Sequence, residues 1–181
     1  LLPAVPFFAL LSACALITLK RRGRRTAWLA GGLLLWLGLS SLHVYPHYLT
    51  YFNEIAGGAQ GGIRFFTDSN LDWGQDLKGL GRWMEQEGVE EVHLSYFGSV
   101  PPEIYDIRYH PLYPEAALGE PGHFSPMAPA PGIYAISATN LTGQYLLSNP
   151  SVFSWFWRQE PIATIGHTIW IFEVLPDPDA P

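Results

Sequence analysis

A basic cluster between two apolar runs is the feature that most constrains this chain. Five of its ten Lys and Arg residues lie between Lys20 and Arg25, and no acidic residue precedes Glu54. The flanking runs, 1–19 and 26–44, are each 19 residues long, which corresponds to about 28 Å of α-helix. A bilayer has a hydrocarbon core of about 30 Å. The pattern therefore predicts a membrane hairpin of two transmembrane helices.

The position of the basic residues also predicts the orientation of this hairpin. Short loops rich in Lys and Arg stay on the cytoplasmic side, so the loop 20–25 is expected in the cytoplasm and the chain after Val44 outside. A signal peptide carries its charge before the apolar run, whereas here the charge follows it. A buried soluble hairpin would not need four arginines at its turn. We therefore expect the lipid bilayer to be a partner.

Charge and cysteine content restrict what the outer part can do. The segment Tyr45–Pro181 has five basic and sixteen acidic residues, a net charge of −11 with His neutral. Nucleic acid is excluded as a partner because phosphate neutralisation needs Lys and Arg. The only cysteine, Cys14, lies in the first apolar run, so the outer part has no disulfide and no cysteine-based zinc site. These features favour a protein of the bacterial cytoplasmic (inner) membrane.

The outer part divides into a connector, a domain and a tail. The connector, 45–62, begins with aromatic residues and ends with glycines, which suits an anchor at the membrane interface. A second interpretation gives His47 or Tyr48 a role facing the substrate. The domain is expected at 63–175, and the Pro/Asp-rich tail 176–181 is expected to be disordered.

Apolar periodicity predicts a small α/β extracytoplasmic domain. A strand at 63–67, a helix at 71–87 and a strand at 92–97 would form a βαβ unit. The stretch 101–131 is expected to be irregular because it holds many prolines. The other predicted elements are a strand at 133–138, short helical pieces at 141–147 and 152–159, and a hairpin of 162–165 with 168–174 around Gly166-His167.

Polar residues that follow the predicted strands form the candidate ligand site. If the strands are parallel, the turns after 63–67, 92–97 and 133–138 meet at one sheet edge, where ligands of α/β proteins bind. Carboxylate and amide groups there could pair with sugar hydroxyls, and Trp73 could stack on a pyranose ring. The candidate ligand-binding residues are Asp68, Asn70, Asp72, Trp73, Gln75, Asp76 and Asn140.

Two other interpretations of this cluster remain open. In the structural one, Asp68 or Asn70 caps the helix and Trp73 packs in the core. In the other, Asp68, Asn70 and Asp72 match the first acidic positions of an EF-hand calcium loop. That loop needs glycine at its sixth position and glutamate at its twelfth, where this chain has Trp73 and Gly79. The scattered histidines do not have the spacing of zinc ligands.

Four stretches of the sequence resemble a known protein family. The stretch from Tyr45 to Glu54 and the stretch from Asp68 to Leu77, together with Leu94–Gly98 and Pro131–Ser137, resemble the C-terminal region of bacterial family-39-like membrane glycosyltransferases of the GT-C class. This group includes the protein O-mannosyltransferase-like and ArnT-like enzymes. The resemblance implies a multi-pass enzyme that transfers a sugar from a polyprenyl-phosphate carrier to an acceptor on the outer face.

The resemblance also implies where catalysis would occur. In this family the catalytic acidic residue lies in an early outer loop, a region that is not in this sequence. No residue here is therefore expected to be the catalytic base, and neither a cofactor nor a metal is expected in this segment. We expect the C-terminal fragment of a longer glycosyltransferase, inactive alone. The alternative is a membrane-anchored carbohydrate-binding or assembly module without catalysis.

Overall fold

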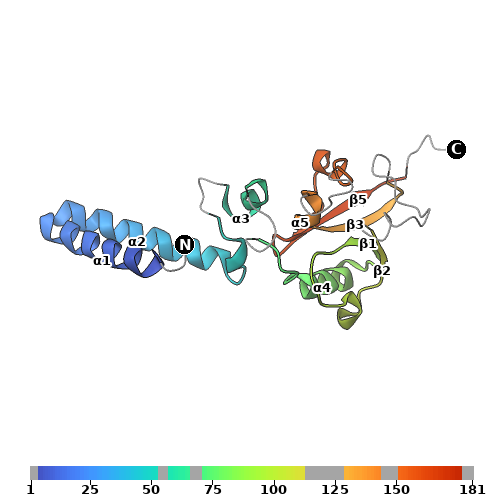
Figure 1. Cartoon of the computed structure of the whole chain (residues 1–181), viewed down its shortest axis with the longest axis horizontal. Helices are drawn as coiled ribbons and strands as arrows, with labels where there is room; N and C mark the ends of the chain where they lie inside the picture. Colours follow the sequence, from blue (N-terminus) through green and yellow to red (C-terminus); the bar gives the residue numbers. More distant parts are fainter. Residues whose placement is uncertain (1–3, 53–56, 66–70, 113–128, 144–150, 177–181) are drawn as a thin grey trace. The chain divides into compact units, whose positions relative to one another are not determined.

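The chain forms two compact units, residues 1–46 and 47–181, and each is considered by itself. The computed structural model describes residues 4–52, 57–65, 71–112, 129–143 and 151–176. Figure 1 shows the course of the chain through these residues.

The first unit is a pair of helices. Helix α1 (Val5–Arg22) and helix α2 (Arg24–Val44) lie side by side (Figure 1) and are joined only at Gly23, whose φ of 145° suits a residue without a side chain. The prediction of a loop at 20–25 is therefore wrong, because the residues on both sides of Gly23 are helical.

Helix α2 has the length and composition of a membrane span. It has 21 residues and is the one helix within the described ranges that meets both requirements. Helix α1, with 18 residues, fails the requirement on composition, since its last three residues are all basic. The structure therefore does not support the two-span hairpin, and the first predicted span, 1–19, stays a prediction.

The second unit, here called the sheet domain, contains a mixed sheet of five described strands. Their order is β2-β1-β3-β5-β4, with β1 parallel to both β2 and β3, and β5 antiparallel to β3 and β4. The predicted third strand and closing hairpin are confirmed. The strands are β1 (Val92–Ser95), β2 (Tyr109–Pro111), β3 (Gly132–Ser137), β4 (Ala163–Ile165) and β5 (Ile169–Val174).

The βαβ unit was predicted with the wrong first strand. Residues Gly62–Arg64 form a 3₁₀ turn, η4, and 66–70 lie outside the described residues. Ile63 is buried in the core from this turn, which explains its apolar character without a strand. The parallel partners of β1 are instead β2 and β3. The connection from β1 to β2 runs through the 3₁₀ turn η6 (Pro102–Tyr105).

Helix α4 (Leu77–Glu87) begins six residues later than predicted and ends where predicted. Its end at Gly88, with φ of 68°, is the left-handed stop expected of glycine. The start is delayed by a turn in which the Asp72 carboxylate accepts a hydrogen bond from the Gly74 N–H, and Gly74 has a φ of 74°. A left-handed residue cannot continue an α-helix.

The other predicted segments are only partly formed as expected. The connector 45–62 holds a 3₁₀ turn, η2 (Tyr48–Thr50), and a short helix, α3 (Gly58–Gly61), while 53–56 lie outside the described residues. The helical pieces are α5 (Ala138–Leu141) and the 3₁₀ turn η8 (Phe156–Arg158). Residues 113–128, 144–150 and 177–181 are also outside the description, so the disorder predicted for the tail cannot be compared.

Apolar side chains cover both faces of the sheet. On one face, Leu77, Leu80 and Met84 of α4 pack with Ala135 of β3. On the other face, aromatic residues surround Phe156, which contacts Tyr134 and Phe172 at ring-centroid distances of 5.1 Å each. Alternate residues of β3 point to opposite faces, so α4 and α5 lie on different sides of the strand (Figure 1).

Removing the Phe156 ring should destabilise the sheet domain. The side chain is fully buried among aromatic neighbours, and Phe→Ala in a core costs about 3–5 kcal/mol. We expect a loss of this size for Phe156→Ala in urea unfolding of the full chain in detergent. Phe65→Ala, at a side chain 62% exposed, is the matched control and should change stability by about 0.5 kcal/mol or less. Equal losses for the two variants would contradict this core.

Candidate functional site

The ends of β1, β3 and β5 bring buried polar groups to one edge of the sheet. Strands β1 and β3 are parallel, with Ser95 opposite Ile136, and β5 begins at this edge because it runs the other way. The Asn140 side chain donates a hydrogen bond to the Ser95 hydroxyl at 3.0 Å. The Phe97 N–H donates to the Ser137 hydroxyl at 2.9 Å. The predicted meeting of the turns after these two strands is confirmed.

The loop Leu71–Asp76 lies at the same edge. The Tyr96 hydroxyl donates a hydrogen bond to the Gly74 carbonyl oxygen at 3.0 Å. A side chain on Gly74 would overlap this hydroxyl group. The Gln75 side chain accepts from the Trp73 N–H at 2.7 Å and donates to the Leu71 carbonyl oxygen at 3.1 Å. The loop is therefore tied both to the sheet and to itself.

Asp72 is a fully buried carboxyl group in this loop. Burial raises its pKa to about 6, against 3.8 normally, and the charge of Asp76 adds to the increase. The N–H groups of Gly74 and Thr139 and the Ser137 hydroxyl oppose the shift. Nevertheless, Oδ2 makes no hydrogen bond of normal geometry within the described residues. A carboxyl group in such surroundings is typical of functional sites.

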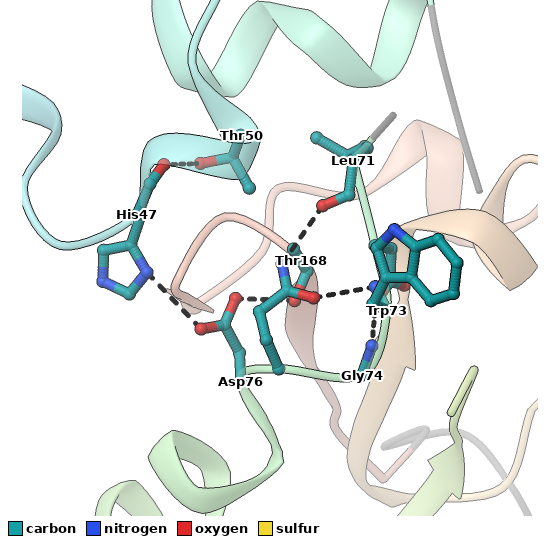
Figure 2. A network of polar contacts seen from close by, with 9 residues as sticks. His47, Thr50, Leu71, Trp73, Gly74, Asp76 and Thr168 are labelled. Carbon is teal, nitrogen blue, oxygen red and sulfur yellow. Dashed lines mark hydrogen bonds and ion pairs between the residues drawn. The ribbon is translucent and has the colours of Figure 1, made fainter. Parts of the chain in front are cut away.

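Asp76 occupies the N-cap position of α4 but does not cap it. No hydrogen bond joins its side chain to the first turn. Its Oδ2 accepts from the Thr168 hydroxyl at 2.7 Å, and its Oδ1 lies 3.4 Å from Nδ1 of His47 (Figure 2). Burial raises the pKa of Asp76, while Thr168 and the charges of His47 and His167 act against this increase. Instead of capping α4, the Asp76 side chain therefore contacts two other segments, at Thr168 and His47.

The hairpin between β4 and β5 is shaped to receive the Asp76 carboxylate. Any side chain on Gly166 would overlap this carboxyl group, and the φ of Gly166 is 56°. The next residue, His167, also has a positive φ of 70°. Its ring lies perpendicular to that of His47 at a centroid distance of 5.8 Å. Asp76 therefore lies close to two imidazole rings that come from distant segments and contact each other.

The predicted site residues fall into three groups. Asp72, Asp76 and Asn140 are buried and belong to the polar edge. Trp73 is 64% exposed, and Gln75 is also exposed. Asp68 and Asn70 lie outside the described residues.

The structural interpretation of this cluster is wrong in two respects. Trp73 does not pack in the core, and the cap position of α4 is held by Asp76 rather than by Asp68 or Asn70. Of the three predicted calcium ligands, only Asp72 is described. Within the described ranges, no three His, Cys, Asp or Glu side chains lie close enough together to hold a metal ion.

His47 belongs to the site, although the sequence predicted it chiefly as part of an anchor at the membrane interface. A substrate-facing role was the second interpretation. Its side chain is 35% exposed and contacts Asp76, and its carbonyl oxygen accepts from the Thr50 hydroxyl at 2.9 Å. No local sequence signal pairs it with Asp76, because the contact depends on the folded domain.

Comparison with known proteins adds no further assignment. No protein-family model matches the sequence, and neither the curated proteins nor the solved structures include a significant match. The function must therefore be argued from these residues.

Replacing Asp72 by Asn should change how stability depends on pH. Between about pH 4 and pH 6 the folded chain binds more protons at Asp72 than the unfolded chain, because its folded pKa is the higher one. Its contribution to stability is thus present at low pH and falls as pH rises through this window. The stability of Asp72→Asn relative to the native chain should increase by up to about 3 kcal/mol from pH 4 to pH 7. Urea unfolding at several pH values measures this difference, and a difference independent of pH would contradict the buried carboxyl.

Proposed function

We propose that this chain is the C-terminal part of a bacterial membrane glycosyltransferase that transfers a sugar from a polyprenyl-phosphate carrier to an acceptor on the outer face. The observation that carries this proposal is the meeting of Asp72, Asp76 and Asn140 beside the exposed Trp73 at one sheet edge. The resemblance of the motif 68–77 to membrane glycosyltransferases supports the same function.

The exposed and buried residues of this site would have different roles in sugar binding. Trp73 offers an apolar indole face to solvent, and such a face can cover the apolar side of a pyranose ring. The Gln75 amide accepts from the Trp73 N–H and donates to the Leu71 carbonyl oxygen, so its role would be to hold the indole in position. Buried Asp72 and Asn140 would fix the loop and the strand ends beneath the ligand.

The helical unit would supply access to a lipid-linked donor. Helix α2 is the stronger candidate span, and we propose residues 1–19 as the second. The basic residues between them would then lie in the cytoplasm by the positive-inside rule. The strongly acidic segment after Val44 would face outwards, where the acceptor is.

Removal of the Trp73 side chain tests the sugar site. We expect Trp73→Ala to reduce sugar transfer at least tenfold in membrane vesicles that contain the full-length protein and polyprenyl-phosphate sugars. Its abundance in the membrane should not change, because an exposed side chain contributes little to folding. Trp73→Phe should keep part of the activity, since an aromatic face remains. Ile104→Ala is the matched control, because Ile104 is also 64% exposed but lies on η6.

The same assay separates the two classes of function. Normal transfer by Trp73→Ala would remove this site from the reaction. Sugar binding that depends on Trp73, without transfer from any polyprenyl-phosphate sugar, would instead favour the membrane-anchored binding module. A parallel fall of abundance and activity would show that Trp73 serves folding.

A further inference from the structure

His47 is held so that one edge of its ring faces Asp76 and the other points away from it. Nδ1 points to the Asp76 carboxylate, and the opposite ring edge, which carries Nε2, points away from Asp76 (Figure 2). Asp76 is itself fixed by the Thr168 hydroxyl at 2.7 Å. An imidazole oriented by a buried carboxylate presents its second nitrogen for contact with a ligand.

We propose that His47 is a phosphate-binding residue: Asp76 holds the ring at Nδ1, and Nε2 donates a hydrogen bond to an anionic phosphate oxygen. This inference rests on the proposed function, because it identifies the phosphate as that of the lipid carrier. It assigns a binding role and no bond-breaking step to His47.

The arrangement of Asp76 is better suited to this role than to a structural one. An aspartate at an N-cap position ordinarily accepts hydrogen bonds from the first turn of its helix, and Asp76 does not. Its carboxylate instead occupies the space that the absent side chain of Gly166 leaves open. A carboxylate in contact with one ring nitrogen sets the orientation of the ring and of its second nitrogen.

The position of His47 in the sequence is suitable for a lipid phosphate. Only Tyr45 and Pro46 separate it from the last residue of α2, which limits the distance to about 11 Å. The headgroup layer on each side of a bilayer is roughly 5–8 Å thick. If α2 spans the membrane, His47 is therefore within covalent reach of the depth at which a carrier phosphate lies.

Three ionisable groups surround His47 among the described residues. These are Asp76 at the start of α4, His167 in the hairpin turn, and Asp72, on which the charge of Asp76 acts. The net charge of −11 after Val44 opposes general attraction of anions, so binding would depend on this local arrangement.

The test uses the full chain in lipid nanodiscs with ¹⁵N-labelled histidine. Nanodiscs that contain polyprenyl phosphate should shift the His47 Nε2 resonance, and nanodiscs of phosphatidylcholine alone should not. Binding should be at least tenfold weaker for His47→Gln, and Asp76→Asn should also weaken it. His110→Gln should bind normally, because His110 of β2 is 61% exposed and pairs with Glu91, just before β1. Thermal unfolding of each variant shows whether it is folded.

Competition with inorganic phosphate shows whether the protein recognises the phosphate group alone or the headgroup of the lipid carrier. Competition at millimolar concentration would show that the phosphate group alone is recognised, whereas binding only of the lipid would show recognition of the carrier headgroup. Both results support the inference. Equal binding by folded His47→Gln, or equal shifts with phosphatidylcholine alone, would overturn it.

Phosphate binding without sugar transfer would overturn the proposed function only. Transfer unaffected by His47→Gln would overturn this inference only.

Discussion

The parallel pairing of β1 with β3 is the constraint on which the candidate site depends. It brings the ends of both strands to one edge, and the antiparallel β5 begins at that edge. Hydrogen bonds from Asn140 to Ser95 and from Thr168 to Asp76 then join segments that are far apart in the sequence. Without this pairing, the polar groups would have no common position.

The site places carboxyl groups where they cost stability. Asp72 is fully buried and Asp76 is nearly so, and burial raises the pKa of both. Apolar side chains of similar size would suit a core better, because burying a charge is unfavourable unless it is well paired. Stability lost at a defined site is often associated with function. The exposed Trp73 and half-exposed His47 are where a ligand could reach this edge.

Local signals predicted some elements well. The hairpin at Gly166-His167 and the end of α4 at Gly88 depend on backbone conformations that their own residues favour. The meeting of the ends of β1 and β3 was predicted on the condition that these strands are parallel, which they are. The segment at Ile63 was wrong because a short apolar run fits a buried turn as well as a strand.

The remaining features required tertiary structure. The turn at Gly74 that delays the start of α4 is also held by Tyr96 from a distant segment. The pairing of His47 with Asp76 joins two segments that no local pattern connects. The exposure of Trp73 was left open as well, because its aromatic ring suited both a ligand site and the core.

A chemical-shift map of the full chain in nanodiscs tests the central claim most directly. The probe is a polyprenyl-phosphate sugar added to uniformly ¹⁵N-labelled protein. The account predicts that shifts concentrate at Trp73, Gln75 and His47, with smaller changes at the strand ends beneath them. Shifts concentrated instead at the cavity between α4 and η6, lined by Lys78 and Tyr105, or no shifts in the sheet domain, would contradict it.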